Sequence, residues 1–598
     1  MTTYRTPIDD MRFVMRELAE LDSLCLMPGC DQASSDLVDA ILAEAGRFGA
    51  EVLAPLNASG DRQGCRLENG VVRAPDGFAD AYRQFVDGGW NGIGLPAEHG
   101  GQGLPALVST AVSEIWSAAN MAFGLCPMLT QAAAELLERH GDAPMRARYL
   151  PDLVSGAWTG TMQLTEPQAG SDLGQVRTRA VPRDRGAYSL FGQKIYITFG
   201  EHDMAPNIVH AVLARTPSAP PGIKGLSLFL VPKYPAGDDG TLGAANDLRC
   251  VSLEHKLGIR GSPTAVMSMG DDGGAIGYLI GEENRGLEMM FTMMNTARLA
   301  VGLQGVGIGD RAYQQARSYA FERIQGRALG ESAPDPVAIA RHPDVQRMLL
   351  TMKAETEAAR ALAYVTAATL DRARHHPDGQ TRARCQRRVD LLTPVVKAWC
   401  TDTGIGIADQ AIQVHGGMGY IEESGVPQFL RDARILSIYE GTNGIQALDL
   451  VGRKVTLDDG LAMRELLGDI DGSLGDEAPP GSDQPAIRDR LGAALHEMID
   501  ATRWLLETYA REPRRVAAGA VYYLRLTGNV VGGWLMWQAA QRAAARLAHG
   551  GGERRFLVAK IKTARCFADT RLAECAGLAD KFRTAADVLR ELDPNQHL

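Results

Sequence analysis

Glu440 stands in a sequence setting that suits a general base, because apolar residues precede it and a glycine follows it. The segment Leu436–Asn443 reads LSIYEGTN. A carboxylate in an apolar pocket has a raised pKa, and it can then remove a proton from carbon near neutral pH. For one glutamate taken alone, a helix N-cap or a solvated surface acid is the more common role, so this hypothesis depends on the rest of the chain.

A second segment, Gln163–Asp172, has the composition of an anion-binding turn. A β-rich run leads through Thr165 and Pro167 into the small residues Ala169–Asp172. Small residues and a hydroxyl at a turn let backbone N–H groups approach a phosphate closely. On composition alone, a tight strand–loop connection capped by serine or aspartate is the more common interpretation.

Two further segments have aromatic or glycine-rich patterns. Tyr196-Ile197-Thr198 ends a β-rich run and could place an aromatic face and a hydroxyl beside a planar ring, although half-buried strands often look like this. Gln413–Tyr420 is glycine-rich, but it is not a GxGxxG motif after a strand, which argues against a Rossmann site. The glycines of Gly305–Gly309 lie in a helical pattern and predict close helix packing.

The elements that must position these segments change type along the chain. Residues 1–158 read mostly as helix, 159–282 as a β domain, and 283–457 as long helices of bundle length. A linker is predicted at 458–486 and a further helical domain at 487–598. The predicted fold class is therefore α+β and mainly α.

Helices and strands follow from the periodicity inside these regions. Amphipathic helices are predicted at 35–53 and 106–148. Strands are predicted at 159–165, 188–198, 208–214, 226–231 and 265–269.

Composition indicates a globular protein and argues against several functions. The chain has 598 residues, 45% of them hydrophobic, and a net charge of −10, which argues against nucleic acid as the main partner. Its nine cysteines show no CxxC spacing, which predicts free thiols and neither disulfides nor a metal site. The start of the chain lacks a signal peptide's apolar core, and Arg525 and Asn529 interrupt Val521–Ala540, so we expect a cytoplasmic protein without a membrane span.

In their order and spacing, the four segments resemble the acyl-CoA dehydrogenase family over roughly residues 40–455. The length and the helical tail resemble the long bacterial subgroup that includes 3-methylthiopropanoyl-CoA dehydrogenases. The resemblance implies an N-terminal helical domain, a middle β-barrel and a C-terminal four-helix bundle, here followed by an additional helical domain. It also implies FAD, an acyl-CoA substrate, electron-transfer flavoprotein as electron acceptor, and a homodimer or larger homo-oligomer whose subunits complete each other's sites.

The resemblance gives roles to individual residues. Glu440 would remove the α-proton of an acyl thioester while FAD accepts the β-hydride, as in fatty-acid β-oxidation. Leu164 and Thr165 would contact the flavin edge, with Thr198 near the reactive nitrogen. The other implied cofactor contacts are Gly170, Ser171, Arg323, Gln413, Gly417 and Thr442. The implied substrate contacts are Ser171, Asn295, Arg298 and Gly441.

Some relatives carry the base on an earlier helix, beside the arginine that Arg298 resembles. That stretch reads Thr296-Ala297-Arg298 here and offers no carboxylate, which favours Glu440. Tyr196 stands where many relatives have tryptophan. Arg298 and Arg323 could instead form structural ion pairs.

Three alternatives share the fold. An acyl-CoA oxidase would reoxidise its flavin with oxygen. A DNA-associated flavoprotein of the alkylation-response type would need a basic face, and the basic clusters near Arg514 and Arg554 are interleaved with acids. A scaffold that keeps FAD for structure alone would not need Glu440. The sequence leaves the acyl chain open.

Overall fold

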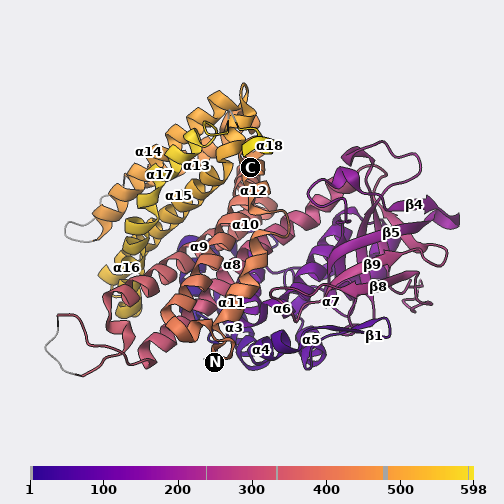
Figure 1. Cartoon of the computed structure of the whole chain (residues 1–598), viewed down its shortest axis with the longest axis horizontal. Coiled ribbons are helices and arrows are strands. Elements are labelled where there is room, and N and C mark those ends of the chain that lie inside the picture. The colour runs from indigo at the N-terminus through magenta and orange to yellow at the C-terminus, as the bar shows by residue number, and fades with distance from the viewer. Residues whose placement is uncertain (1–3, 238, 331–334, 476–482, 590–591, 598) are drawn as a thin grey trace. The chain divides into compact units, whose positions relative to one another are not determined.

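The computed structural model describes residues 4–237, 239–330, 335–475, 483–589 and 592–597 (Figure 1). The chain forms two compact units, each described by itself below. The first unit combines residues 1–44, 105–114 and 301–598, and the second combines residues 45–104 and 115–300. Helices α3 (Ser35–Phe48), α6 (Ala106–His140) and α8 (Gly286–Glu322) contribute residues to both units.

The second unit is built on an eight-stranded sheet, where the family resemblance implies a β-barrel (Figure 1). The order is β3-β6-β7-β10-β5-β9-β8, with β4 paired to β5. β3 and β6 are parallel, and the other pairs are antiparallel. The strands are β3 (Thr159–Gln163), β4 (Arg179–Pro182), β5 (Ala187–Thr198), β6 (Ile208–Ala214), β7 (Ser227–Pro232), β8 (Leu248–Leu253), β9 (Thr264–Met269) and β10 (Ala275–Ile280).

The five predicted strands correspond to β3, β5, β6, β7 and β9, with bounds that differ by at most two residues at either end. β6 and β7 are buried along their whole length, which explains their clear apolar signal. Sequence reasoning missed β4, β8, β10 and the short hairpin of β1 (Arg66–Glu68) and β2 (Val71–Arg73). β8 shows why, because most of its residues are exposed or only partly buried and its apolar pattern is weak.

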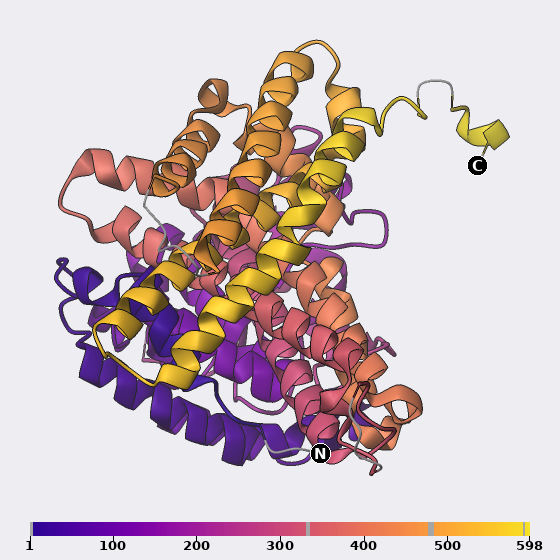
Figure 2. The ribbon, with the colours of Figure 1, turned by 90° about the vertical axis from the view of Figure 1, so that its left-hand side faces the viewer.

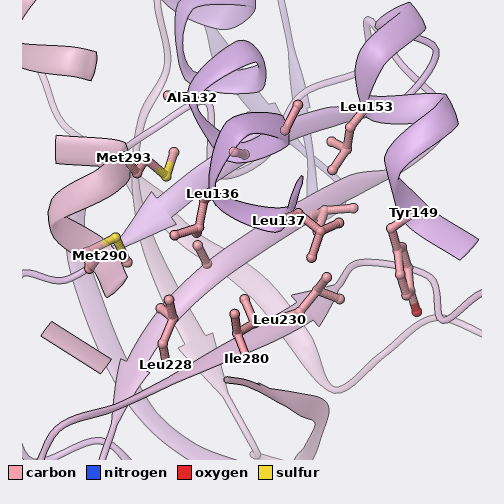
Figure 3. Packing of buried hydrophobic residues seen from close by; sticks show 14 of the residues in the cluster. Ala132, Leu136, Leu137, Tyr149, Leu153, Leu228, Leu230, Ile280, Met290 and Met293 are labelled. Atoms are coloured by element: carbon pink, nitrogen blue, oxygen red, sulfur yellow. The ribbon is translucent and has the colours of Figure 1, made fainter. Parts of the chain in front are cut away.

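An apolar core joins the sheet to helices within the second unit. Leu136 and Leu137 of α6 and Leu153 of α7 (Ala143–Ser155) pack against Leu230 and Ile280 of the sheet (Figure 3). Met290 and Met293 of α8 complete this cluster. The methionine-rich segment is therefore partly core, which is the usual role for such residues.

The helical pattern predicted over 106–148 is confirmed, but the stretch is not one continuous helix, because the chain is interrupted twice. Asn120 has non-helical backbone angles inside α6, and its side chain accepts a hydrogen bond from the Phe123 amide, as a helix cap does. α6 then ends at His140, and Asp142 caps α7 by accepting from the Met145 amide at 2.8 Å. The remaining helices of this unit are α4 (Ala54–Gln63) and α5 (Phe78–Asp87).

The first unit contains the predicted bundle of long helices. Its members are the later part of α8, α9 (Pro343–His375) and α10 (Gly379–His415), followed by α11 (Val426–Ala433) and α12 (Asn443–Asp449). The prediction of close packing at Gly305 is confirmed, because a Cβ there would lie 2.4 Å from the Cys400 carbonyl oxygen of α10. The short helices α1 (Ile8–Phe13) and α2 (Leu21–Leu24) precede this bundle in the chain.

Further helices follow the bundle. Helices α14 (Gln484–Tyr509), α15 (Pro513–Ala548), α16 (Arg554–Thr570) and α17 (Cys575–Thr584) lie side by side, and Figure 2 shows them in orange and yellow. α18 (Pro594–His597) is the last helix. No helix in the described parts of the chain is both long and apolar enough to span a membrane.

The linker predicted at 458–486 is wrong in its first half. Helix α13 occupies Leu461–Ser473, and it buries Met463, Leu466 and Ile470 at helical spacing. The apolar stripe is short and is flanked by glycines and aspartates, so the periodicity of the sequence did not reveal this helix. Residues 476–482 of the predicted linker lie outside the described residues.

A cluster of buried charges ties together distant parts of the first unit. Lys560 of α16 is 1% exposed and donates to Asp10 of α1 at 2.7 Å and to Glu357 of α9 at 2.8 Å. Arg360 of α9 pairs with Asp10 at 2.6 Å and with Glu114 at 2.6 Å. Buried ions of both signs satisfy each other here, as such groups must.

Candidate active site

Glu440 lies in a short connection with an unusual backbone. Glu440 has φ +57° and Gly441 has φ +81°, so two consecutive residues adopt the left-handed conformation. For a residue with a side chain, this conformation costs about 1–2 kcal/mol and persists only where the surroundings enforce it. Thr442 then caps α12 by accepting a hydrogen bond from the Ile445 amide at 3.2 Å.

Side chains on both sides of Glu440 hold this connection. The hydroxyl of Tyr439 donates to Oε1 of the buried Gln304 on α8. Burial, and next the charge of Glu440, raise the pKa of Tyr439 well above its usual value, so the phenol stays protonated as a donor. The side chain of Gln446 donates to the carbonyl oxygens of Glu440 and Gly441, both at 3.3 Å.

In the second unit, a buried ion pair shapes the turn after β3. Lys194 of β5 donates to Glu166 at 2.9 Å and to the Leu164 carbonyl oxygen at 3.0 Å. The Ile195 amide donates to the Thr165 carbonyl oxygen at 2.9 Å. Leu164 and Thr165 are therefore fixed beside β5 through their backbones, while both residues remain partly exposed.

The predicted phosphate contacts lie in the exposed part of the same turn. Gly170 and Ser171 are exposed, and a Cβ at Gly170 would meet no atom within 4 Å. Asp172 accepts from the Gly174 amide at 3.0 Å, which closes the turn locally. An anion can therefore approach the backbone at Gly170 closely.

The end of β5 is irregular where the sequence suggested a surface for a planar ring. Tyr196 and Phe199 have φ of +60° and +50°, and the register with β9 shifts between Lys194 and Ile197. This bulge leaves Tyr196 60% exposed. The Thr161 hydroxyl of β3 donates to the Thr198 carbonyl oxygen at 2.7 Å, so the end of β5 is fixed to the strand that precedes Leu164.

The other predicted residues lie at helix ends and on α8. His415 at the end of α10 stacks on Tyr319 near the end of α8, with ring centroids 4.3 Å apart, so these two helix ends adjoin in the first unit. The exposed residues Gln413, Gly417 and Arg323 lie at these ends. In the second unit, the buried Arg298 guanidinium lies 5.8 Å from the Phe291 ring centroid and contacts Asn295 at 3.5 Å.

Four protein-family models match the chain in sequence. They are described as the acyl-CoA dehydrogenase N-terminal domain at residues 35–157, the middle domain at 161–271, the C-terminal domain at 284–455, and an acetyl-CoA dehydrogenase C-terminal-like domain at 466–593. The chain belongs to the acyl-CoA dehydrogenase family.

Two named relatives match this chain along nearly its whole length. The chain is 50% identical to 3-methylmercaptopropionyl-CoA dehydrogenase of Ruegeria pomeroyi over 98% of this chain and 99% of that protein. It is 34% identical to a butyryl-CoA dehydrogenase of Syntrophomonas wolfei over 94% of both. The predicted family and activity class are thereby confirmed, and the chain is an FAD-dependent oxidoreductase of the acyl-CoA dehydrogenase type.

Solved structures show the same fold. Caenorhabditis elegans ACDH-11, solved in complex with C11-CoA, has a TM-score of 0.78 at 22% identity, covering 99% of this chain and 96% of that one. An acyl-CoA dehydrogenase from Bacillus anthracis complexed with FAD has a TM-score of 0.73 at 22% identity, covering 98% and 95%. The mainly helical fold with a central β domain and extra C-terminal helices is therefore confirmed.

For this acyl-CoA dehydrogenase, the structure groups the predicted residues by unit. Leu164, Thr165, Gly170, Ser171 and Thr198 gather around β3 and β5 of the second unit, and Glu440, Gly441 and Thr442 follow one another in the first. Sequence reasoning missed the residues that hold them, namely Glu166, Lys194, Gln304, Lys397, Asn443 and Gln446. Lys397 could have been found from the sequence, because a lysine inside the apolar stretch Val395–Cys400 indicates a buried charge that needs a partner.

Proposed function

We propose that the protein dehydrogenates an acyl-CoA thioester between the α and β carbons, with Glu440 as the base that removes the α-proton. The observation that carries this proposal is the left-handed backbone at Glu440, held by Gln446 from one side and through Tyr439 from the other. Strained residues of this kind cluster at functional sites. Glu440 is also the only carboxylate in the segment Leu436–Asn443.

The residues around β3 and β5 fit FAD. The exposed Tyr196 offers an aromatic face for a planar ring, and the open space at Gly170 admits a pyrophosphate near backbone amides. We assign Leu164, Thr165 and Thr198 to the flavin, with Gly170 and Ser171 at its pyrophosphate. We assign Arg323, Gln413, Gly417 and Thr442 to the remaining cofactor contacts. When bound, FAD supplies the oxidising power by accepting hydride from the substrate's β-carbon.

The protein's own contribution is orientation, electrostatics and proton removal. A saturated thioester has a weakly acidic α-carbon, so the base must be held at a fixed position and the developing enolate must be stabilised. Glu440 would hold the departing proton, and a backbone N–H of its connection would donate to the thioester carbonyl. Asn295, Arg298, Ser171 and Gly441 would contact the acyl-CoA.

For the substrate, we propose a short acyl chain, with a thioether group as the first choice. Support comes from the 50% identity to a 3-methylmercaptopropionyl-CoA dehydrogenase over nearly both whole chains, whereas identity to a butyryl-CoA dehydrogenase is 34%. Electrons would then pass to electron-transfer flavoprotein, as in acyl-chain β-oxidation. The nine free cysteines suit a reducing compartment, and we place the protein in the cytoplasm.

We also propose a homodimer. Apolar side chains are exposed around the adjoining ends of α8 and α10, with Phe321 58%, Met418 50% and Tyr420 88% exposed. Exposed apolar side chains that gather in one region mark association surfaces. Arg323 and Gly417 lie in the same region, so a second copy there would also meet the proposed cofactor contacts. Light scattering of the purified protein would measure the oligomeric state.

Anaerobic flavin bleaching near roughly 450 nm tests the reaction and the substrate together. We expect 3-methylthiopropanoyl-CoA and butyryl-CoA to bleach the flavin faster than long-chain thioesters do. Glu440→Gln should slow bleaching by about 10²–10⁴-fold, the usual contribution of a general base, with FAD retained. Glu423→Gln, at an exposed glutamate of the same unit, is the control.

Equal bleaching by wild type and Glu440→Gln would reject Glu440 as the base. Absence of bleaching by every thioester, in protein that holds FAD, would reject the dehydrogenase proposal and direct attention to DNA binding. Stoichiometric hydrogen peroxide during turnover in air would instead identify an oxidase.

A further inference from the structure

The side-chain amide of Asn443 connects the segment that carries Glu440 to helix α10. Its Nδ2 atom, which carries two hydrogens, donates to Asp402 Oδ1 at 2.6 Å and Thr401 Oγ1 at 3.0 Å, and it shares a hydrogen with the Ala398 carbonyl oxygen at 3.2 Å. Its Oδ1 atom accepts from Lys397 Nζ at 2.8 Å. The first residue of α12 is therefore fixed to nearly two turns of α10.

The two ends of the amide meet opposite charges, which explains why an amide suits this position. Lys397 is fully buried and needs an acceptor, whereas the exposed Asp402 carboxylate accepts a hydrogen bond at the other end of the amide. An asparagine side chain provides one acceptor oxygen and two N–H donors, so it satisfies both neighbours at once. An aspartate of the same shape would keep the contact to Lys397 and lose the donor to Asp402.

We propose that Asn443 is a positioning residue for the dehydrogenation, because it fixes to α10 the connection in which Glu440 adopts its left-handed backbone. This proposal rests on the proposed role of Glu440. Glu440 and Gly441 both have positive φ, and only Thr442 separates them from Asn443, so a displacement of the start of α12 is transmitted directly to the base.

The cost of such a displacement is large for proton removal from carbon. The base must lie within hydrogen-bonding reach of the proton, and a misplacement of about 1 Å reduces rates by about 10²-fold. Substrate affinity depends mostly on other contacts, so a positioning defect should lower kcat and leave KM nearly unchanged.

The test compares Asn443→Asp and Asn443→Ala with a matched control, Asn529→Ala, in the full-length FAD-loaded enzyme. Asn529 is another buried amide beside α10, where it accepts from Trp399 Nε1 at 3.0 Å and donates to the Arg571 carbonyl oxygen at 3.0 Å. We expect kcat with a short acyl-CoA to fall about 10- to 100-fold in both Asn443 variants, with KM within about 3-fold and FAD retained. The control should stay within about 2-fold of wild type. In a Lys397→Met background, Asn443→Ala should cost less than it does in the wild-type background, because that background already lacks one of the contacts of Asn443.

Three outcomes would overturn the proposal. The first is an unchanged kcat in both Asn443 variants when Glu440→Gln is inactive. This outcome would reject the role of Asn443 and leave the proposed function intact. The second is a rise in KM with unchanged kcat. The third is loss of FAD or of folding in Asn443→Asp while Asn529→Ala stays folded, since Asn443 would then stabilise the protein generally. Full activity of Glu440→Gln would instead reject the proposed function itself.

Discussion

At the scale of single residues, Glu166 shows how this protein keeps a buried carboxylate ionised. It accepts hydrogen bonds from the Arg177 amide at 2.7 Å, the Thr178 amide at 3.0 Å and the Gln168 side chain at 2.6 Å, besides the Lys194 ammonium. Burial opposes ionisation, but the Lys194 ammonium, the Thr178 hydroxyl and the Arg177 amide lower the pKa of Glu166 from 4.5 to about 2. The turn that carries Leu164 and Thr165 therefore depends on one charge pair.

The first prediction concerns Lys194→Met, which leaves Glu166 buried without its cation. Because the folded-state pKa of Glu166 lies below its ordinary value, the carboxylate stabilises the wild-type fold above about pH 4.5, and this contribution is lost as the pH falls toward 2. We expect Lys194→Met to cost about 3–5 kcal/mol at pH 7. The cost should shrink as the pH falls toward 4, because an unpaired buried carboxylate takes up a proton.

Thermal unfolding between pH 4 and 7 measures this effect. Arg249→Gln is the control, since its pair with Asp271 is exposed and should contribute less than about 1 kcal/mol. A loss that stays constant across this pH range would show that Glu166 is not the cause.

The sequence led to candidate chemical residues, but it gave little sign of the residues that hold them in the folded chain. Glu440 could be proposed as the base because apolar neighbours and a glycine surround it locally. Its restraints come from far along the chain, since Tyr439 bonds Gln304 across 135 residues and Asn443 bonds Lys397 across 46. Local patterns contain no information on such pairs, which arise only when the bundle is assembled.

At the scale of elements, glycines set the distance between α8 and α10. A Cβ at Gly305 would meet backbone atoms of Cys400 and Thr401, and a Cβ at Gly404 would lie 2.4 Å from the Gly305 carbonyl oxygen. Backbone cannot move aside as a flexible side chain can. Since Thr401 also bonds Asn443, this contact helps define the surface on which the Glu440 segment rests.

The second prediction compares two helical glycines. Gly305→Ala should destabilise the protein by about 1–3 kcal/mol, because overpacking outweighs the gain in helix propensity. Gly468→Ala in α13 should stabilise it by about 0.5–1 kcal/mol, since a Cβ there meets nothing within 4 Å. Chemical denaturation of both variants measures the difference. Stabilisation by Gly305→Ala would contradict the contact.

Periodicity predicted most elements because burial on one face leaves a regular apolar pattern. It failed where burial is partial, as in β8, or where polar capping residues interrupt a helix, as at Asn120 and Asp142. It also failed at α13, whose apolar stripe is short. These failures lie outside the segments around Glu440 and Glu166, so a site could be proposed from the sequence although several element boundaries could not.

At the scale of the whole molecule, buried charge connects the C-terminal helices to the bundle. Lys560 and Arg360 meet Asp10, Glu357 and Glu114 with almost no exposure to solvent. In the sequence these residues look like ordinary surface charges on helices, and nothing local marks them as buried. Only the folded unit shows that they neutralise one another.

The third prediction is that Lys560→Met destabilises the first unit by about 3–5 kcal/mol, because it leaves two buried carboxylates without their shared cation. Lys562→Met is the matched control on the same helix, where Lys562 is 62% exposed and pairs with Asp483. Thermal unfolding and amide hydrogen exchange of residues 8–18 provide the readouts. Adding Asp10→Asn should recover part of the loss, and a further loss of full size would contradict the proposed pairing.

The hydrogen bond between Asp10 and Lys560 spans 550 residues, nearly the whole length of the chain. At about 5–20 residues per second, a ribosome delivers Lys560 roughly half a minute to two minutes after Asp10. Throughout that interval the first helix lacks a partner that its final burial requires, and the nascent chain must be kept from aggregating. A premature stop just before α16 would therefore leave the opening segment without its buried partner, and we expect cellular proteases to attack the protein at its N-terminal end.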